Sequence, residues 1–141
     1  QTVRAFKEAM AFNGPAIILA YSHCIAHGID MMKGVEEQKK AVASGHWPLL
    51  RYNPDLAREG KNPLMLDSQE PSIGMDEFAY GEVRWNTLLK SKPEIARQLM
   101  ELAKANVKAR WRLLKHLASM DYSTVSGEAP KTSPTTNLHQ K

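Results

Sequence analysis

A short, continuous apolar run after a Gly-Pro turn constrains the fold more than any other feature. Residues 16–21 read Ala-Ile-Ile-Leu-Ala-Tyr, after the turn residues 13–15 and before the polar Ser22. An apolar, partly β-branched run without alternation is typical of a strand buried on both faces of a parallel sheet. Residues 2–12 have helical apolar spacing. We therefore expect an α/β fold in which residues 2–21 are the second half of a β-α-β unit.

The remaining pattern adds helices and a strand pair to this sheet. Helical spacing predicts a helix over residues 32–43 and a partly helical segment over 75–89. Residues 49–52 and 64–66 are two short strand candidates separated by turn signals, and an antiparallel pairing suits them. Ser91-Lys92-Pro93-Glu94 predicts a capping box that opens a long helix ending near Ala118.

The chain divides into a folded part and a polar tail. We expect residues 1–120 to form one structural unit and residues 121–141 to be a separate tail. From Ser123 the chain is mostly Ser, Thr, Pro, Gly and Lys. Such a segment cannot bury enough apolar surface to offset its ordering entropy, so we expect it to be disordered.

Charge and cysteine content narrow the possible functions. The net charge is +4, and residues 91–141 hold nine Lys/Arg against four Asp/Glu. A solvated basic helix explains this excess better than a nucleic-acid partner does. A single cysteine excludes an internal disulfide and fits a reducing cytoplasm.

The run at 16–21 is too short to span a membrane, and no signal peptide is visible. An opening at Gln1, already inside a helical pattern, favours a piece of a longer polypeptide.

Several strings resemble one family of redox enzymes. Residues 14–28, GPAIILAYSHCIAHG, are similar to the segment GPSLIIAYSPCINHG of single-chain pyruvate:ferredoxin (flavodoxin) oxidoreductases. The matches continue with the same order and spacing through residues 38–54, 60–71, 82–85 and 93–96. In this chain His23 replaces the usual Pro, and Ala26 stands where Asn is common. The resemblance extends from the first helix to about Ala118.

This resemblance implies a fold, a reaction and cofactors. The chain would be the C-terminal part of a thiamine-diphosphate-binding, doubly wound parallel sheet domain with an appended strand pair and C-terminal helices. The family oxidatively decarboxylates pyruvate with coenzyme A to acetyl-CoA and CO2. Electrons pass through 4Fe–4S clusters to ferredoxin or flavodoxin. Thiamine diphosphate and Mg²⁺ would be bound elsewhere in a homodimeric parent, so the resemblance implies that this chain alone is inactive.

The resemblance also assigns a role to Cys24. It implies that Cys24 is one ligand of the 4Fe–4S cluster nearest the thiamine cofactor. The loop after a strand is a suitable place for a ligand, and iron–sulfur clusters bind cysteine thiolates. His23 and His27 could hydrogen-bond to the cluster sulfurs, or they could be ordinary loop histidines near solvent. The alternative for Cys24 is that it only packs as a small apolar side chain.

Two other groups of residues have structural explanations. Asp67 and Glu70 could be read as a paired acid and base, but no nucleophile accompanies them, and turn or capping roles are favoured. Arg110, Trp111 and Arg112 could stack on a nucleic acid. An exposed helix face with an anchoring Trp is the preferred interpretation. The alternative function is a non-catalytic structural or basic-helix binding segment in which Cys24 only packs.

Overall fold

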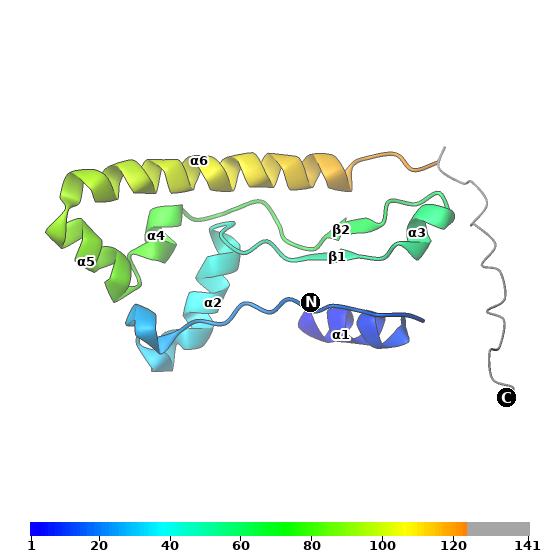
Figure 1. The fold of residues 1–141 in the computed structure, drawn as a ribbon, viewed down its shortest axis with the longest axis horizontal. Coiled ribbons are helices and arrows are strands. Elements are labelled where there is room, and N and C mark those ends of the chain that lie inside the picture. Colours follow the sequence, from blue (N-terminus) through cyan, green and yellow to red (C-terminus); the bar gives the residue numbers. More distant parts are fainter. Residues whose placement is uncertain (124–141) are drawn as a thin grey trace, which may run out of the picture.

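The computed structural model describes residues 1–123, and one long helix sets its long axis (Figure 1). In chain order the elements are α1 (Thr2–Ala11), the 3₁₀ helices η1 (Ile25–His27) and η2 (Met31–Lys33), α2 (Gly34–Ala43), β1 (Leu50–Tyr52), α3 (Asp55–Arg58), β2 (Leu64–Leu66), α4 (Met75–Ala79), α5 (Val83–Ser91) and α6 (Pro93–Ala118). The predicted helices are confirmed, with 75–89 divided into α4 and α5. Residues 124–141, which make up most of the predicted tail, lie outside the described residues.

The start of α6 follows from proline rather than from a serine cap. Pro93 occupies the first turn, where its missing N–H costs no hydrogen bond. The predicted capping box is wrong, because Ser91 is the last residue of α5 and its hydroxyl donates to the carbonyl of Thr87 at 2.9 Å. Only Lys92 separates α5 from α6. Ser91 therefore belongs to α5, and Lys92 is the N-cap of α6.

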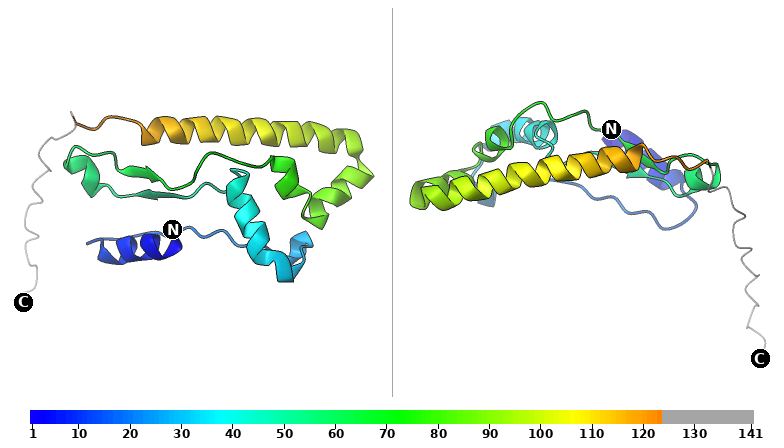
Figure 2. Two further views of the ribbon diagram at one scale, coloured as in Figure 1. Left: turned by 180° about the vertical axis from the view of Figure 1, so that it is seen from behind. Right: turned by 90° about the horizontal axis from the view of Figure 1, so that it is seen from above.

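The predicted strand pair is confirmed as an antiparallel hairpin. Leu50 lies opposite Leu66, Arg51 opposite Met65 and Tyr52 opposite Leu64. β2 contacts α6, whereas α1 lies on the β1 side of the hairpin (Figures 1 and 2). The hairpin is therefore inserted between the long helix and the first helix.

The apolar core lies where α2, α4 and α6 meet. Phe78 is only 2% exposed and stacks on the ring of His46 with centroids 4.8 Å apart. Burying one such side chain contributes roughly 1.5–3 kcal/mol. The buried apolar side chains that pack together here are Ala41, Met75, Phe78, Ala79, Met100 and Val107. The core therefore belongs to the helices and not to a sheet.

The predicted buried strand at residues 16–21 is not formed. This segment has no regular secondary structure, and Ile17 is 87% exposed. A buried strand needs paired strands beside it and covered faces. No backbone–backbone hydrogen bond within the described residues involves residues 15–23. The doubly wound parallel sheet is accordingly absent from residues 1–123, whose one sheet is the antiparallel pair.

The first helix is held by polar contacts. α1 buries none of its residues. The guanidinium of Arg51 on β1 reaches the Glu8 carboxylate, and Gln1 donates to Asp67 at 3.0 Å. Phe6 and its apolar neighbours on α1 therefore remain largely exposed in this chain.

Candidate functional site

Cys24 lies at the surface, on a short loop before α2. Its thiol is free and the residue is exposed. It is the N-cap of η1, and its carbonyl accepts a hydrogen bond from the backbone N–H of His27 at 3.0 Å. Gly28 closes this turn in the left-handed region, with φ of 71°. In this chain Cys24 is thus a presented side chain, not part of the core.

The side of the loop after Cys24 is attached to the start of α5. The Nδ1 atom of His27 lies 3.1 Å from Oε2 of Glu82. The N–H of Val83 donates to the carbonyl of Gly28 at 3.0 Å. A Cβ at Gly28 would come within 2.7 Å of the Val83 Cβ, so the two backbones approach as closely as glycine allows. These contacts join segments that are 55 residues apart in the chain.

The side of the loop before Cys24 is attached to α2. The amide nitrogen of Gln38 lies 2.9 Å from Nδ1 of His23. An amide nitrogen donates, so Nδ1 of His23 accepts this hydrogen bond. The His23 ring also lies against Gly34, where a Cβ would come within 2.5 Å of Nε2. Both histidines therefore bond to protein groups beneath the loop, and Cys24 stands between them.

Two buried carboxylates lie beneath this loop. Glu82 and Glu37 are both buried, and among residues 1–123 the Oε1 atom of each has no hydrogen-bond partner. Burial raises the pKa of Glu37, although Lys40 opposes the shift and Glu82 adds to it. Burial and then the charges of Glu82 and Glu37 raise the pKa of Tyr21. Two carboxylates therefore lie close to Tyr21 in the buried region beneath the loop.

His46 belongs to the same buried region. Burial, with the Arg110 charge nearby, lowers the pKa of the His46 imidazole, while Glu82 opposes that shift. A lowered histidine pKa keeps the ring neutral at neutral pH. His46 accordingly acts as a packed aromatic group against Tyr21 and Phe78.

The donor atoms fit one ligand position of a shared iron–sulfur cluster. Such clusters are held by four cysteine thiolates, and this chain contains one cysteine. No group of three or more His, Cys, Asp or Glu side chains suited to a metal ion occurs among residues 1–123. Cys24 is exposed on an anchored loop, so it could join three thiolates supplied from elsewhere.

The other candidate residues have structural partners. Arg51 forms a bidentate pair with Asp67, whose two carboxylate oxygens lie 2.7 Å from Nε and Nη2. The expected turn or capping role of Asp67 is therefore corrected to an ion pair. Glu70 faces a different cation, Lys115, at 3.6 Å. Asp67 and Glu70 accordingly have separate partners rather than forming one acid–base site.

The aromatic–basic cluster on α6 is largely committed to the fold. Trp111 is buried rather than presented for stacking. Arg110 donates to the carbonyls of Gly45 and His46 at 2.9 and 2.6 Å. The interpretation of Trp111 as an anchor is confirmed. Because its ring is buried, Trp111 is not available to stack on a nucleic acid.

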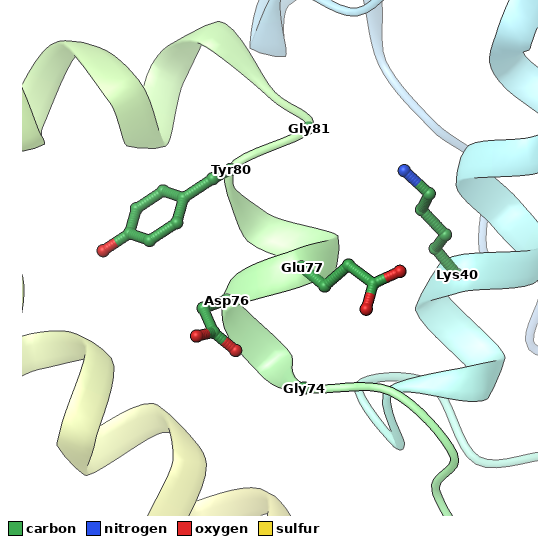
Figure 3. Close-up of a pocket in the computed structure, with 6 residues that line it drawn as sticks. All are labelled: Lys40, Gly74, Asp76, Glu77, Tyr80 and Gly81. Atoms are coloured by element: carbon green, nitrogen blue, oxygen red, sulfur yellow. The ribbon is translucent and has the colours of Figure 1, made fainter.

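A shallow pocket lies between α2 and α4, and Cys24 is not among its lining residues (Figure 3). Its lining residues are Lys40, Gly74, Asp76, Glu77, Tyr80 and Gly81. Lys40 and Glu77 extend into the space between the two helices, whereas Tyr80 points away from it. Asp76 instead faces Lys104 on α6, with 3.4 Å between Oδ2 and Nζ. This pocket brings together opposite charges, and neither cysteine nor histidine is among its lining residues.

Sequence reasoning missed Glu82, Glu37 and Gln38. Local sequence does not mark Glu82 as part of the Cys24 site, because Trp85 is a partner within α5 whereas His27 is 55 residues away. The match of residues 82–85 to a family string was the only available signal for Glu82.

Among the described helices, none has both the length and the apolarity needed to cross a membrane.

Comparison with known proteins finds relatives that are named as oxidoreductases of pyruvate. No protein-family model matches the chain. It is 56% identical over 119 residues to the pyruvate-flavodoxin oxidoreductase of Nostoc sp. PCC 7120. It is 48% identical over 118 residues to the pyruvate:ferredoxin oxidoreductase of Moorella thermoacetica, and 42% identical over 121 residues to the pyruvate-flavodoxin oxidoreductase of Rhodospirillum rubrum.

Coverage of these alignments is unequal on the two sides. Each covers 84% or 85% of this chain but 10% of the relative. The chain therefore spans about a tenth of the length of the curated relatives that it matches. The resemblance predicted from the sequence is confirmed.

Proposed function

Because the chain is homologous to a segment of the pyruvate-flavodoxin and pyruvate:ferredoxin oxidoreductases, we propose that it is part of an enzyme of this kind. That enzyme oxidises pyruvate with coenzyme A to acetyl-CoA and CO2. The electrons released in this oxidation leave through iron–sulfur clusters to flavodoxin or ferredoxin. The remainder of a longer polypeptide supplies thiamine diphosphate, Mg²⁺ and the residues that contact pyruvate.

Within that enzyme, Cys24 supplies one thiolate to a 4Fe–4S cluster. The observation that carries this proposal is an exposed, free thiol on a loop attached on both sides to the helices beneath it. A rigidly presented thiolate suits a cluster ligand, because the other three ligands must come from separate segments. The cluster, when bound, supplies one-electron transfer. The role of the chain's own residues is to present and orient the thiol.

The test compares cluster content in the full-length protein with and without this thiol. Cys24→Ala should lose or convert one cluster signal in the EPR spectrum of the dithionite-reduced protein, lower its iron content and impair pyruvate oxidation. Ile25→Ala is the matched control, because Ile25 is the next residue, is exposed and has no thiol. It should keep the wild-type spectrum. Unchanged iron content and an unchanged spectrum in Cys24→Ala would refute the ligand role.

A further inference from the structure

Glu82 is a buried carboxylate with an unusual set of partners. Only 2% of it is exposed. Its Oε2 atom accepts from Nε1 of Trp85 at 3.0 Å and faces Nδ1 of His27 at 3.1 Å. Oε1 has no partner. Burying a charged group is costly unless it is paired, so His27 and Trp85 are what makes this carboxylate tolerable in the interior.

The position of Glu82 in the fold adds to this effect. It is the N-cap of α5, a nine-residue helix whose N-terminal dipole favours a negative charge. Its side chain does not cap the helix by a hydrogen bond. The carboxylate instead bonds to Trp85 within α5 and faces His27 on the loop that precedes α2, so it joins its own helix to that loop.

A continuous series of contacts leads from Glu82 to Cys24. The Glu82 carboxylate faces the His27 ring, and a carboxylate accepts, so the hydrogen of this bond belongs to Nδ1. The His27 N–H in turn donates to the carbonyl of Cys24 at 3.0 Å. Both bonds of His27 act on the same short turn, η1. Fixing the ring of His27 therefore also limits the movement of the turn that carries the thiol.

We propose that Glu82 is a positioning residue that holds the Cys24 loop in its thiol-presenting conformation through the His27 imidazole. This inference rests on the proposed function of Cys24. Glu82 does not touch Cys24. Its effect is to keep the loop in one conformation, which fixes the direction from which the thiolate reaches the cluster.

The experiment follows the reduced cluster in the full-length protein. Glu82→Ala should alter the EPR line shape of one cluster. It should also speed the loss of iron to a chelator such as bathophenanthroline by about tenfold to a hundredfold, the range expected when a hydrogen bond to a charged group is lost. Glu82→Gln keeps the shape and an acceptor oxygen for His27 and Trp85. It should restore both properties to within about twofold of wild type.

Glu37→Ala is the matched control. Glu37 is also a buried glutamate with an unpartnered Oε1, but none of the side-chain hydrogen bonds of residues 1–123 joins it to the Cys24 loop. It should therefore leave the line shape unchanged. An equal change in Glu37→Ala would overturn the inference, because removing any buried carboxylate would then be sufficient.

A second variant keeps the test valid if Glu82→Ala does not fold. The His27 side chain is 37% exposed, so His27→Ala removes the same contact from the solvent side. It should alter the same cluster signal. If Cys24→Ala removes the cluster while Glu82→Ala or His27→Ala leaves its line shape and iron loss unchanged, the positioning role is refuted and the ligand role stands. If Cys24→Ala itself changes nothing, the proposed function fails first.

Discussion

Replacing Gly28 by alanine should loosen the attachment of the Cys24 loop to α5. Gly28 has a φ of 71°, and an added Cβ would lie 2.7 Å from the Cβ of Val83. Two costs therefore combine: a left-handed backbone that side chains disfavour, and a steric overlap that forces the loop and α5 apart. The bond most directly affected is the one from the Val83 N–H to the Gly28 carbonyl.

The magnitude follows from these two costs. A residue with a Cβ in the left-handed region costs roughly 1–2 kcal/mol. Overpacking adds about 1–3 kcal/mol, and the lower end applies here because Val83 is 59% exposed and can move toward solvent. The free energy of opening this attachment should fall by about 2–3 kcal/mol, which corresponds to roughly 30- to 150-fold faster exchange of the protected amide.

Hydrogen–deuterium exchange of the Val83 amide in the full-length protein measures this opening directly. Gly60→Ala is a matched control, because Gly60 has the same φ of 71° but its added Cβ meets nothing closer than 3.6 Å. It carries only the backbone cost, about 1–2 kcal/mol, and carries it in the hairpin loop. Gly28→Ala should therefore speed amide exchange around its own site by at least about fivefold more than Gly60→Ala speeds exchange around residue 60.

The reasoning would be refuted by either of two results. One is an unchanged exchange rate for the Val83 amide in Gly28→Ala. The other is an equal local effect in Gly28→Ala and Gly60→Ala, which would mean that the close approach of the loop to α5 contributes nothing to its attachment.

Two further predictions concern stability, each read from urea unfolding followed by tryptophan fluorescence. Phe78→Ala should lower the free energy of unfolding by about 3–5 kcal/mol, because it removes a buried aromatic ring and leaves a cavity in the core. Phe6→Ala, at a 49% exposed position, should cost under about 1 kcal/mol, and similar losses in both would contradict the location of the core. Hydrogen bonds from Arg51 lower the pKa of Asp67, so this carboxylate adds stability above its unfolded pKa and loses it as the pH falls through the lowered value. Stability should drop on acidification below about pH 4, and Asp67→Asn should flatten that dependence; an equally steep acid dependence in the variant would count against it.

The sequence was sufficient for features that depend on neighbours in the chain. Helical spacing predicted α1, α2 and α6, and the position of Pro93 marked where α6 begins. Turn residues predicted the hairpin between residues 49 and 66. Similarity to longer enzymes pointed to Cys24, which no local pattern could have distinguished from a buried cysteine.

Residues 16–21 show how a local pattern can fail. Their apolar, β-branched composition is suited to a strand, but a strand is stabilised by partners that lie elsewhere in a polypeptide. Within residues 1–123 none pairs with this segment, which has no regular secondary structure and is exposed except at Tyr21. Composition therefore determined a tendency, and the presence of neighbours decided the outcome.

The faces of α6 show the same division between tendency and outcome. Both Met100 and Leu102 are apolar and lie two residues apart, yet Met100 is buried and Leu102 is exposed. Helical periodicity could place them on different faces, but the elements that pack on α6, among them α4, α5 and β2, decided which face is covered.

The support of the Cys24 loop was decided by tertiary structure alone. The sequence placed His23 and His27 beside Cys24, but their partners Gln38 and Glu82 are 15 and 55 residues away. A hydrogen bond between distant residues leaves no periodic or compositional mark, because it depends on how the helices pack and not on the spacing of residues along the chain. The sequence alone thus determined which thiol to consider, and the packing of α2 and α5 beneath the loop decided how that thiol is held.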